Sequence, residues 1–217
     1  MTLPMNLLRR LLACLLSWYC LAALPAAEVE ATEYPLSFLP DPDPVDGQTF
    51  RVLCLHDVRD NLRASFASFP DGFAIETRTL VDLFEWLRAN DYHPVSLAQI
   101  VAARNGGAPL PPRPVLLTFD DGFASMYTKV FPLLKQFGYP AVAAIVTKWV
   151  DAPPDARIRL SAKLEVPRNT FLNWDQVKEM ADSGLVEIAS HTHDLHRGVI
   201  GNPQGNILDI EAAAAVA

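Results

Sequence analysis

The chain has 217 residues, a formal net charge of −7 at pH 7, 50% hydrophobic residues and 20% charged residues. This composition is ordinary for a folded protein, and the length suits one domain, or one domain with appendages. The negative charge and the lack of a basic stripe in the sequence argue against a nucleic-acid partner. A neutral or cationic substrate is easier to accommodate, because the chain offers no electrostatic attraction to polyanions.

Residues 1–27 have the composition of a secretory signal peptide. The basic pair Arg9-Arg10 precedes an apolar run over residues 11–24, and the small pair Ala26-Ala27 follows it. This order is typical of an export signal, and the apolar run is short for a membrane span. We therefore expect cleavage and export; an uncleaved anchor is the alternative.

The three cysteines fit an exported protein. Cys14 and Cys20 lie within the predicted signal, so the processed chain keeps only Cys54 and forms no internal disulfide. Cys14 follows too short an apolar stretch for lipid attachment, and Cys20 follows two bulky aromatic residues. Simple cleavage is favoured over lipidation.

Residues 28–50 are predicted to form a linker or an irregular arm. The stretch Asp41-Pro42-Asp43-Pro44 disfavours a helix, because each proline lacks an amide donor and restricts the residue before it. The acidic residues there do not match the spacing of a calcium loop, so a solvated turn is expected.

From residue 51 onwards, short apolar runs alternate with segments of helical periodicity. The apolar runs predict strands over residues 51–55, 115–119, 141–146 and 185–189, with an extended segment at 94–97. The periodic segments predict helices over residues 79–89, 127–137 and 174–183. Alternating strands and helices favour an α/β fold with a parallel sheet.

Local signals mark several helix ends. Ser96 is a cap for a short helix through Ala103, and Asn173 and Gly184 mark the start and the end of the 174–183 helix. Pro132 falls within the 127–137 segment and interferes with its first turn.

Polar residues follow three of the predicted strands. His56 follows residues 51–55, the pair Asp120-Asp121 follows 115–119, and His191 follows 185–189. Ligands of parallel α/β proteins bind at the carboxyl ends of the strands, so these residues are expected at one rim. Carboxylates and imidazoles together are suited to a divalent-metal site with a base beside it.

Taken alone, each motif has an ordinary structural explanation. Asp-Asp-Gly is commonly a turn, and a single histidine such as His56 is usually a satisfied polar residue. His191 and His196 are not neighbours on a helix face, so they converge only if the chain turns sharply after the strand. His193 is expected in a pocket wall. The two motifs together favour the metal site, because each supplies what the other lacks.

The stretch Thr118-Phe119-Asp120-Asp121-Gly122 and residues 190–196 resemble the two signature motifs of the polysaccharide deacetylases, the NodB-like carbohydrate esterases. The spacing of the two histidines is similar to that in the poly-β-1,6-N-acetyl-D-glucosamine N-deacetylases of bacterial biofilms. The likeness runs from about Arg51 to Gly205.

This resemblance implies a role for each matching residue. Asp121, His191 and His196 would bind one divalent metal ion, which is Zn or else Co, Ni or Fe. Asp120 would be the general base. His56 would help to bind or protonate the reacting group.

The resemblance also implies a fold and a function. Residues 51–217 would form the N-terminal part of a distorted (β/α) barrel, an incomplete polysaccharide deacetylase domain. The activity would be metal-dependent hydrolytic N-deacetylation of poly-β-1,6-N-acetyl-D-glucosamine with release of acetate. The protein would act in the periplasm, in association with an outer-membrane polysaccharide export apparatus. The alternatives are deacetylation of another glycan, such as peptidoglycan or chitin oligomers, and an inactive carbohydrate-binding remnant.

The family continues beyond the point at which this chain stops, so we expect turnover near background from the chain alone. Positioning of a sugar requires a complete pocket. Acetate release from β-1,6-linked oligomers at about 1 per second or faster would contradict this expectation.

We predict that the segment before Glu28 is absent from the mature protein, because the signal is removed during export. Mass spectrometry of the N-terminus, on protein from an expressing bacterium, measures this. An intact Met1 on soluble cytoplasmic protein would contradict the prediction.

Overall fold

The computed structural model describes residues 46–66, 68–160 and 164–194. All of them belong to one compact unit, Asp43–Ala217. The predicted signal peptide, residues 28–45 of the predicted arm, and His196 lie outside the described residues. Among the described helices, none combines the length and the apolar character that a membrane crossing requires.

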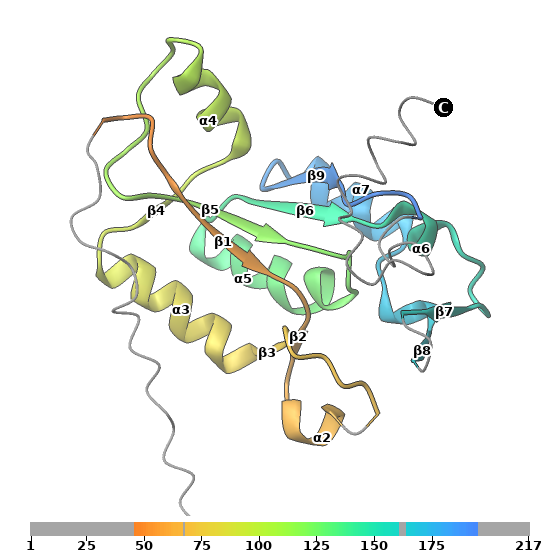
Figure 1. Cartoon of the computed structure of the whole chain (residues 1–217). Helices are drawn as coiled ribbons and strands as arrows, with labels where there is room; N and C mark the ends of the chain where they lie inside the picture. The colour runs from red at the N-terminus through yellow and green to blue at the C-terminus, as the bar shows by residue number, and fades with distance from the viewer. Residues whose placement is uncertain (1–45, 67, 161–163, 195–217) are drawn as a thin grey trace, which may run out of the picture. The chain divides into compact units, whose positions relative to one another are not determined.

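A parallel β-sheet forms the centre of the described fold (Figure 1). Its strands follow the order β1 (Arg51–Leu55), β5 (Pro114–Phe119), β6 (Ala141–Ile145) and β9 (Val186–Ser190). The short strand β4 (His93–Pro94) also pairs in parallel with the first residues of β5. The parallel sheet confirms the predicted α/β fold class.

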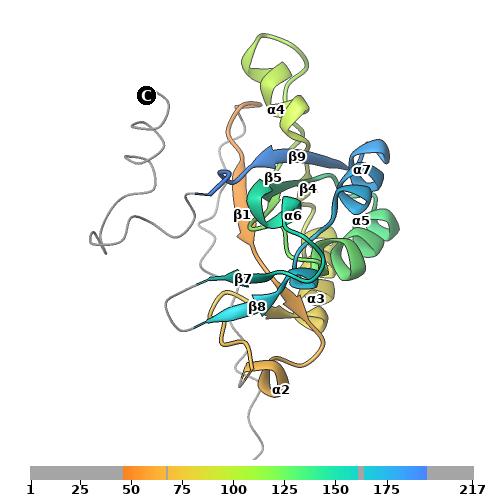
Figure 2. The ribbon, with the colours of Figure 1, turned by 90° about the vertical axis from the view of Figure 1, so that its right-hand side faces the viewer.

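Helices cover one face of this sheet with a large apolar core. Figure 2 shows α3 (Thr77–Ala89), α5 (Phe131–Phe137) and α7 (Trp174–Asp182) on the same side of the strands. Val115, Leu117 and Phe119 point into this core, together with apolar residues of the three helices. Alternate residues of a strand face opposite sides, and Leu116 accordingly packs in a second cluster with α4 (Leu97–Arg104). Strand β5 is therefore apolar on both faces, as is typical of a central parallel strand.

The predicted helix ends agree with the observed caps. The Ser96 hydroxyl accepts a hydrogen bond from the Gln99 amide, and the Gln99 side chain accepts one from the Ser96 amide. Asn173 and Gln176 make the same reciprocal pair at the start of α7. Such capping boxes satisfy amide groups that the first turn of a helix leaves unpaired.

The predicted 127–137 helix is divided in two. A π-helical turn, η2 (Met126–Val130), precedes α5, and Pro132 lies in the first turn of α5. Proline has no amide hydrogen and its ring clashes with the carbonyl four residues earlier, so the wider turn before it is a physical response to Pro132.

Sequence patterns did not indicate the shortest elements, because two to five residues carry too little periodicity. These elements are β2 (Val58–Arg59), α2 (Leu62–Phe66), β3 (Ile75–Glu76), α6 (Thr147–Asp151), β7 (Arg157–Arg159), β8 (Glu165–Pro167) and the 3₁₀ turn η3 (Arg168–Thr170).

We predict that Leu117→Ala lowers the free energy of unfolding by about 2–5 kcal/mol, because it leaves a cavity in the middle of β5. Leu117 is 0% exposed. The half-exposed Val101 of α4 provides the control, and Val101→Ala should change the free energy by less than about 0.5 kcal/mol. Urea denaturation measures both, and equal losses would contradict the assigned core.

Candidate functional site

Strand register brings the predicted site residues to one edge of the sheet. Leu55 lies opposite Phe119, and the Asp120 amide donates a hydrogen bond to the Leu55 carbonyl at 2.9 Å. On the far side of β6, the His191 amide donates to the Ile145 carbonyl at 2.9 Å. The carboxyl ends of β1, β5 and β9 therefore carry His56, Asp120-Asp121 and His191 along the same edge.

Asp121 and His191 face each other across this edge. The His191 Nε2 atom lies 3.4 Å from the Asp121 Oδ1 atom, and the Asp121 side chain is almost fully buried. Two ligands of one zinc ion, each about 2.0–2.2 Å from the metal, lie roughly 3.4 Å apart in tetrahedral geometry. The oxygen and nitrogen atoms present thus fit two positions of a divalent metal.

A left-handed turn after β5 allows this placement. Asp121 has φ of 73° and Gly122 has φ of 79°, in the region that asparagine, aspartate and glycine tolerate best. A Cβ atom on Gly122 would lie only 3.1 Å from the Ile145 Cγ2 atom, so a larger residue would crowd Ile145 and would also be strained at this positive φ. The Asp-Asp-Gly sequence forms a turn, as its composition favours, and it also supplies two carboxylates.

Asp120 has different neighbours from Asp121. The Cys54 thiol donates a hydrogen bond to Asp120 Oδ2, with 3.2 Å between sulfur and oxygen. One ligand atom each of Cys54, His56 and Asp120 lies within 4.8 Å of the others. Burial raises the pKa of the Cys54 thiol, and the hydrogen bond to Asp120 adds to the effect. The two adjacent carboxylates therefore belong to two groups, one beside β1 and one beside β9.

Cys54 was not among the predicted site residues. In the sequence, Cys54 is distinguished only as the one cysteine outside the predicted signal peptide. A signal was present in the sequence, because Cys54 precedes His56 by two residues at the end of a predicted strand, and residues two apart along an extended chain share a face.

The chain after His191 packs against the start of α6. Thr192 has φ of 71°, and the chain therefore turns sharply as it leaves β9. The His193 ring is hydrogen-bonded to the Thr147 hydroxyl at 2.8 Å, and Asp194 forms an ion pair with Lys148. His193 thus contacts α6, and its expected place in a pocket wall stays a prediction. The position of His196, and hence its predicted role as the third ligand, stays a prediction.

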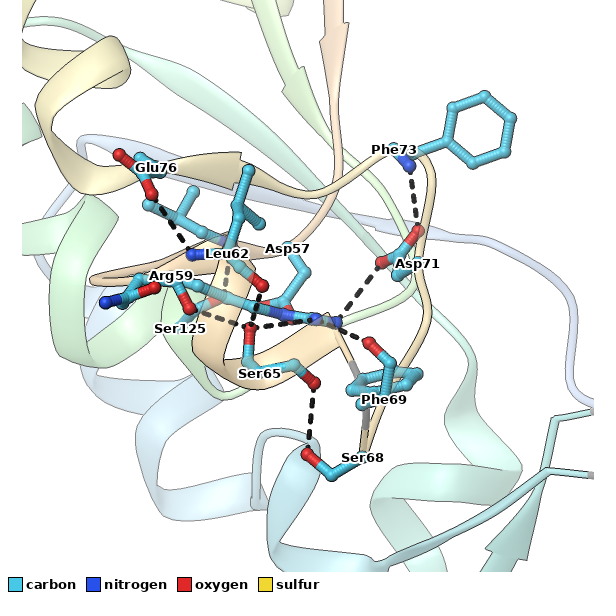
Figure 3. A network of polar contacts seen from close by, with 12 residues as sticks. Asp57, Arg59, Leu62, Ser65, Ser68, Phe69, Asp71, Phe73, Glu76 and Ser125 are labelled. Carbon is cyan, nitrogen blue, oxygen red and sulfur yellow. Dashed lines mark hydrogen bonds and ion pairs between the residues drawn. The ribbon is translucent and has the colours of Figure 1, made fainter. Parts of the chain in front are cut away.

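A buried polar network fixes the chain next to His56 (Figure 3). Asp57 accepts a hydrogen bond from the Ser125 hydroxyl at 2.6 Å and from the Arg59 Nε atom at 2.7 Å. The Ser125 oxygen in turn accepts the Val58 amide at 3.1 Å. Because Ser125 follows the Asp-Asp-Gly turn, this network ties the segment after β1 to the segment after β5.

The same network supports an aromatic side chain beside His56. Arg59 donates to the Phe69 carbonyl at 2.7 Å and lies 3.7 Å from Asp71, whose carboxylate accepts the Phe73 amide at 2.9 Å. The Phe73 ring stacks on the His56 ring with centroids 5.1 Å apart, although Phe73 is 72% exposed. His56 is therefore bounded by Phe73 on one side and by the Asp120 group on another.

We predict that Ser125→Ala lowers the free energy of unfolding by about 1–3 kcal/mol, because one buried acceptor and one amide lose their partner. Ser68→Ala is the matched control, since the Ser68 hydroxyl is exposed, and should cost less than about 0.5 kcal/mol. Chemical denaturation measures both variants. A Ser125→Ala protein as stable as the control would contradict the importance of the network.

The chain resembles known proteins in both sequence and structure. Residues 107–214 match the family described as polysaccharide deacetylase. The chain is 45% identical over 161 residues to the poly-β-1,6-N-acetyl-D-glucosamine N-deacetylase of Escherichia coli K12; the match covers 74% of this chain and 23% of that protein. A protein of the same description from Staphylococcus epidermidis is 27% identical over 144 residues, covering 66% of this chain and 45% of the relative.

Solved structures give the same result. The deacetylase domain of BpsB from Bordetella bronchiseptica has a TM-score of 0.64 and 68% identity, over 76% of this chain and 62% of that one. A de-N-acetylase from Aggregatibacter actinomycetemcomitans has a TM-score of 0.65 and 46% identity, over 72% and 60%. The chain thus spans less than two thirds of each of these proteins. The matches confirm the expected fold, the (β/α) barrel type of these deacetylases, and the chain belongs to the polysaccharide deacetylase family.

Proposed function

We propose that this chain carries the metal-binding and base-bearing part of a poly-β-1,6-N-acetyl-D-glucosamine N-deacetylase. The observation that carries the proposal is the separation of two adjacent carboxylates: Asp121 faces His191 at 3.4 Å, whereas Asp120 faces Cys54 and His56. Deacetylation needs one carboxylate that binds a metal and a second carboxylate that remains able to accept a proton. The names of the Escherichia coli and Staphylococcus epidermidis relatives support this choice of substrate.

Asp121 and His191, together with His196, would hold one divalent metal ion. Zn is the first choice, and the nitrogen and oxygen donors also suit Co, Ni or Fe. A metal bound there supplies a Lewis acid, which acidifies water and stabilises negative charge on a carbonyl oxygen. The deep burial of Asp121 strengthens such an electrostatic interaction, because little water screens it.

Asp120 would act as the general base. Its carboxylate takes a proton from the water that adds to the acetamide carbon, the C–N bond then breaks, and the sugar amine takes up a proton. The products are acetate and a free amine. His56 lies in the same group as Asp120, so it is placed to bind the reacting group or to return the proton to the amine.

Export is part of the proposal. The basic, apolar and small residues of 1–27 support passage across the inner membrane. A polymer made for the cell surface would be met in the periplasm, where association with an outer-membrane polysaccharide export apparatus would place the enzyme on its path.

Acetate release from defined oligomers tests the substrate. The chain, and a version extended through any downstream reading frame, are assayed with β-1,6-linked and β-1,4-linked N-acetylglucosamine oligomers. We expect the β-1,6-linked oligomers to be preferred. Preference for β-1,4-linked oligomers would indicate peptidoglycan or chitin as the substrate class. Zn²⁺ binding without acetate release from either protein would indicate an inactive remnant.

We predict that Asp121→Asn and His191→Ala each weaken binding of the first equivalent of Zn²⁺ by at least about 10–100-fold, because a ligand is lost. Asp120→Asn should keep this affinity, and in the extended version of the chain it should lower deacetylation by about 10²–10⁴-fold, because an amide cannot accept the proton. Calorimetric titration and acetate release measure the two effects.

Asp82→Asn provides the control, since Asp82 is an exposed carboxylate of α3 that pairs only with Arg78 in the structure described. It should change neither quantity. Loss of Zn²⁺ binding in Asp120→Asn with retention in Asp121→Asn would mean that the roles of the two carboxylates are reversed.

A further inference from the structure

A thiol, an imidazole and a carboxylate meet at the end of β1. They belong to Cys54, His56 and Asp120, whose ligand atoms lie within 4.8 Å of one another. We propose that these three side chains form a second metal site, distinct from the Asp121–His191 pair, that binds Zn²⁺ or a similar thiophilic divalent cation.

Strand pairing, rather than a loop, brings the three donors together. Cys54 lies in β1 and His56 directly follows that strand; residues two apart along an extended chain point to the same face. The parallel register places Cys54 opposite Thr118 and Leu55 opposite Phe119, so the next position along each chain sets His56 beside Asp120. The hydrogen bond from the Asp120 amide to the Leu55 carbonyl at 2.9 Å holds this register beyond the last pair. The site therefore needs little rearrangement of the backbone.

The distances suit a tetrahedral ion. The Cys54 Sγ and Asp120 Oδ2 atoms are 3.2 Å apart. With Zn–S of about 2.3 Å and Zn–O of about 2.1 Å, two tetrahedral ligands lie about 3.6 Å apart. If the sulfur and oxygen atoms move apart by a few tenths of an ångström, both can bind the same ion. The stacking of Phe73 on His56, with ring centroids 5.1 Å apart, restricts the imidazole that completes the set.

The donor types decide which cations bind. One sulfur, one nitrogen and one oxygen atom favour Zn²⁺ and Co²⁺ over Mg²⁺ and Ca²⁺, which prefer oxygen ligands. The half-exposed position of His56 and the exposed position of Cys54 leave the fourth position open to water. Cys54 is also the only cysteine after residue 20, so no other thiol of the processed chain competes for the ion.

This site bears on the reaction through Asp120. A cation bound to the Asp120 carboxylate prevents that group from accepting a proton, so excess Zn²⁺ would inhibit deacetylation. This consequence rests on the proposed function, in which Asp120 is the base. Binding of the ion does not rest on the proposed function, because it depends only on Cys54, His56 and Asp120.

Cobalt spectroscopy tests the site in the full chain carrying Cys14→Ser and Cys20→Ser, in which Cys54 is the only thiol. Co²⁺ should produce a thiolate-to-metal charge-transfer absorption, and Cys54→Ser should abolish it. His56→Gln should weaken Co²⁺ binding at this site at least about tenfold. His191→Ala should retain the absorption, since His191 belongs to the other pair. His93→Gln is the histidine control, because His93 pairs with Pro114 at the opposite end of β5.

Protection from alkylation gives a second readout that needs no change at Cys54. Zn²⁺ should slow the reaction of Cys54 with iodoacetamide at least tenfold, and Mg²⁺ at the same concentration should not. Equal alkylation rates with and without Zn²⁺, an absorption that persists in Cys54→Ser, or the absence of any absorption at saturating Co²⁺ would each overturn the proposal. Neither readout measures acetate release, so this proposal and the proposed deacetylation can fail separately.

Discussion

The parallel register between β1 and β5 is the constraint on which the rest of the site depends. It extends past the last paired residues through the hydrogen bond between the Asp120 amide and the Leu55 carbonyl. The apolar residues of β5 are packed on both faces, so sliding the strand by one residue would move every side chain to the opposite face and disrupt the packing of both clusters. The hydrophobic core thereby fixes where Asp120 lies relative to His56, although neither side chain belongs to that core.

A second constraint acts one residue later. The left-handed conformations of Asp121 and Gly122 turn the chain directly behind β5, and a side chain at position 122 would be strained at this φ and crowded by Ile145. The turn sends two neighbouring carboxylates to different partners. One meets the imidazole at the end of β9, and the other meets the thiol and imidazole beside β1. Two carboxylates that are adjacent in the sequence therefore have different neighbouring groups, and no long inserted loop is needed to separate them.

Sequence patterns were informative where many residues share one periodicity. The four long strands and helices α3 and α7 were predicted because their apolar faces repeat, and the capping residues Ser96 and Asn173 marked the starts of α4 and α7 correctly. The buried network of Asp57, Arg59 and Ser125 had no such signal. Its members lie as many as 68 residues apart, and each is a common surface residue when considered alone. The same holds for Phe73, whose stacking on His56 depends on a loop held by that network.

The sequence by itself determined the alternation of strands and helices, the polar residues at the strand ends and the family to which the motifs belong, because these properties are local or repeat along the chain. Only the tertiary structure decided which donors meet. The pairing of Asp121 with His191, the approach of Cys54 to Asp120 and the contact of His193 with α6 follow from strand order and from positive φ angles. Those properties arise from packing between segments distant in the chain, and no single segment encodes them.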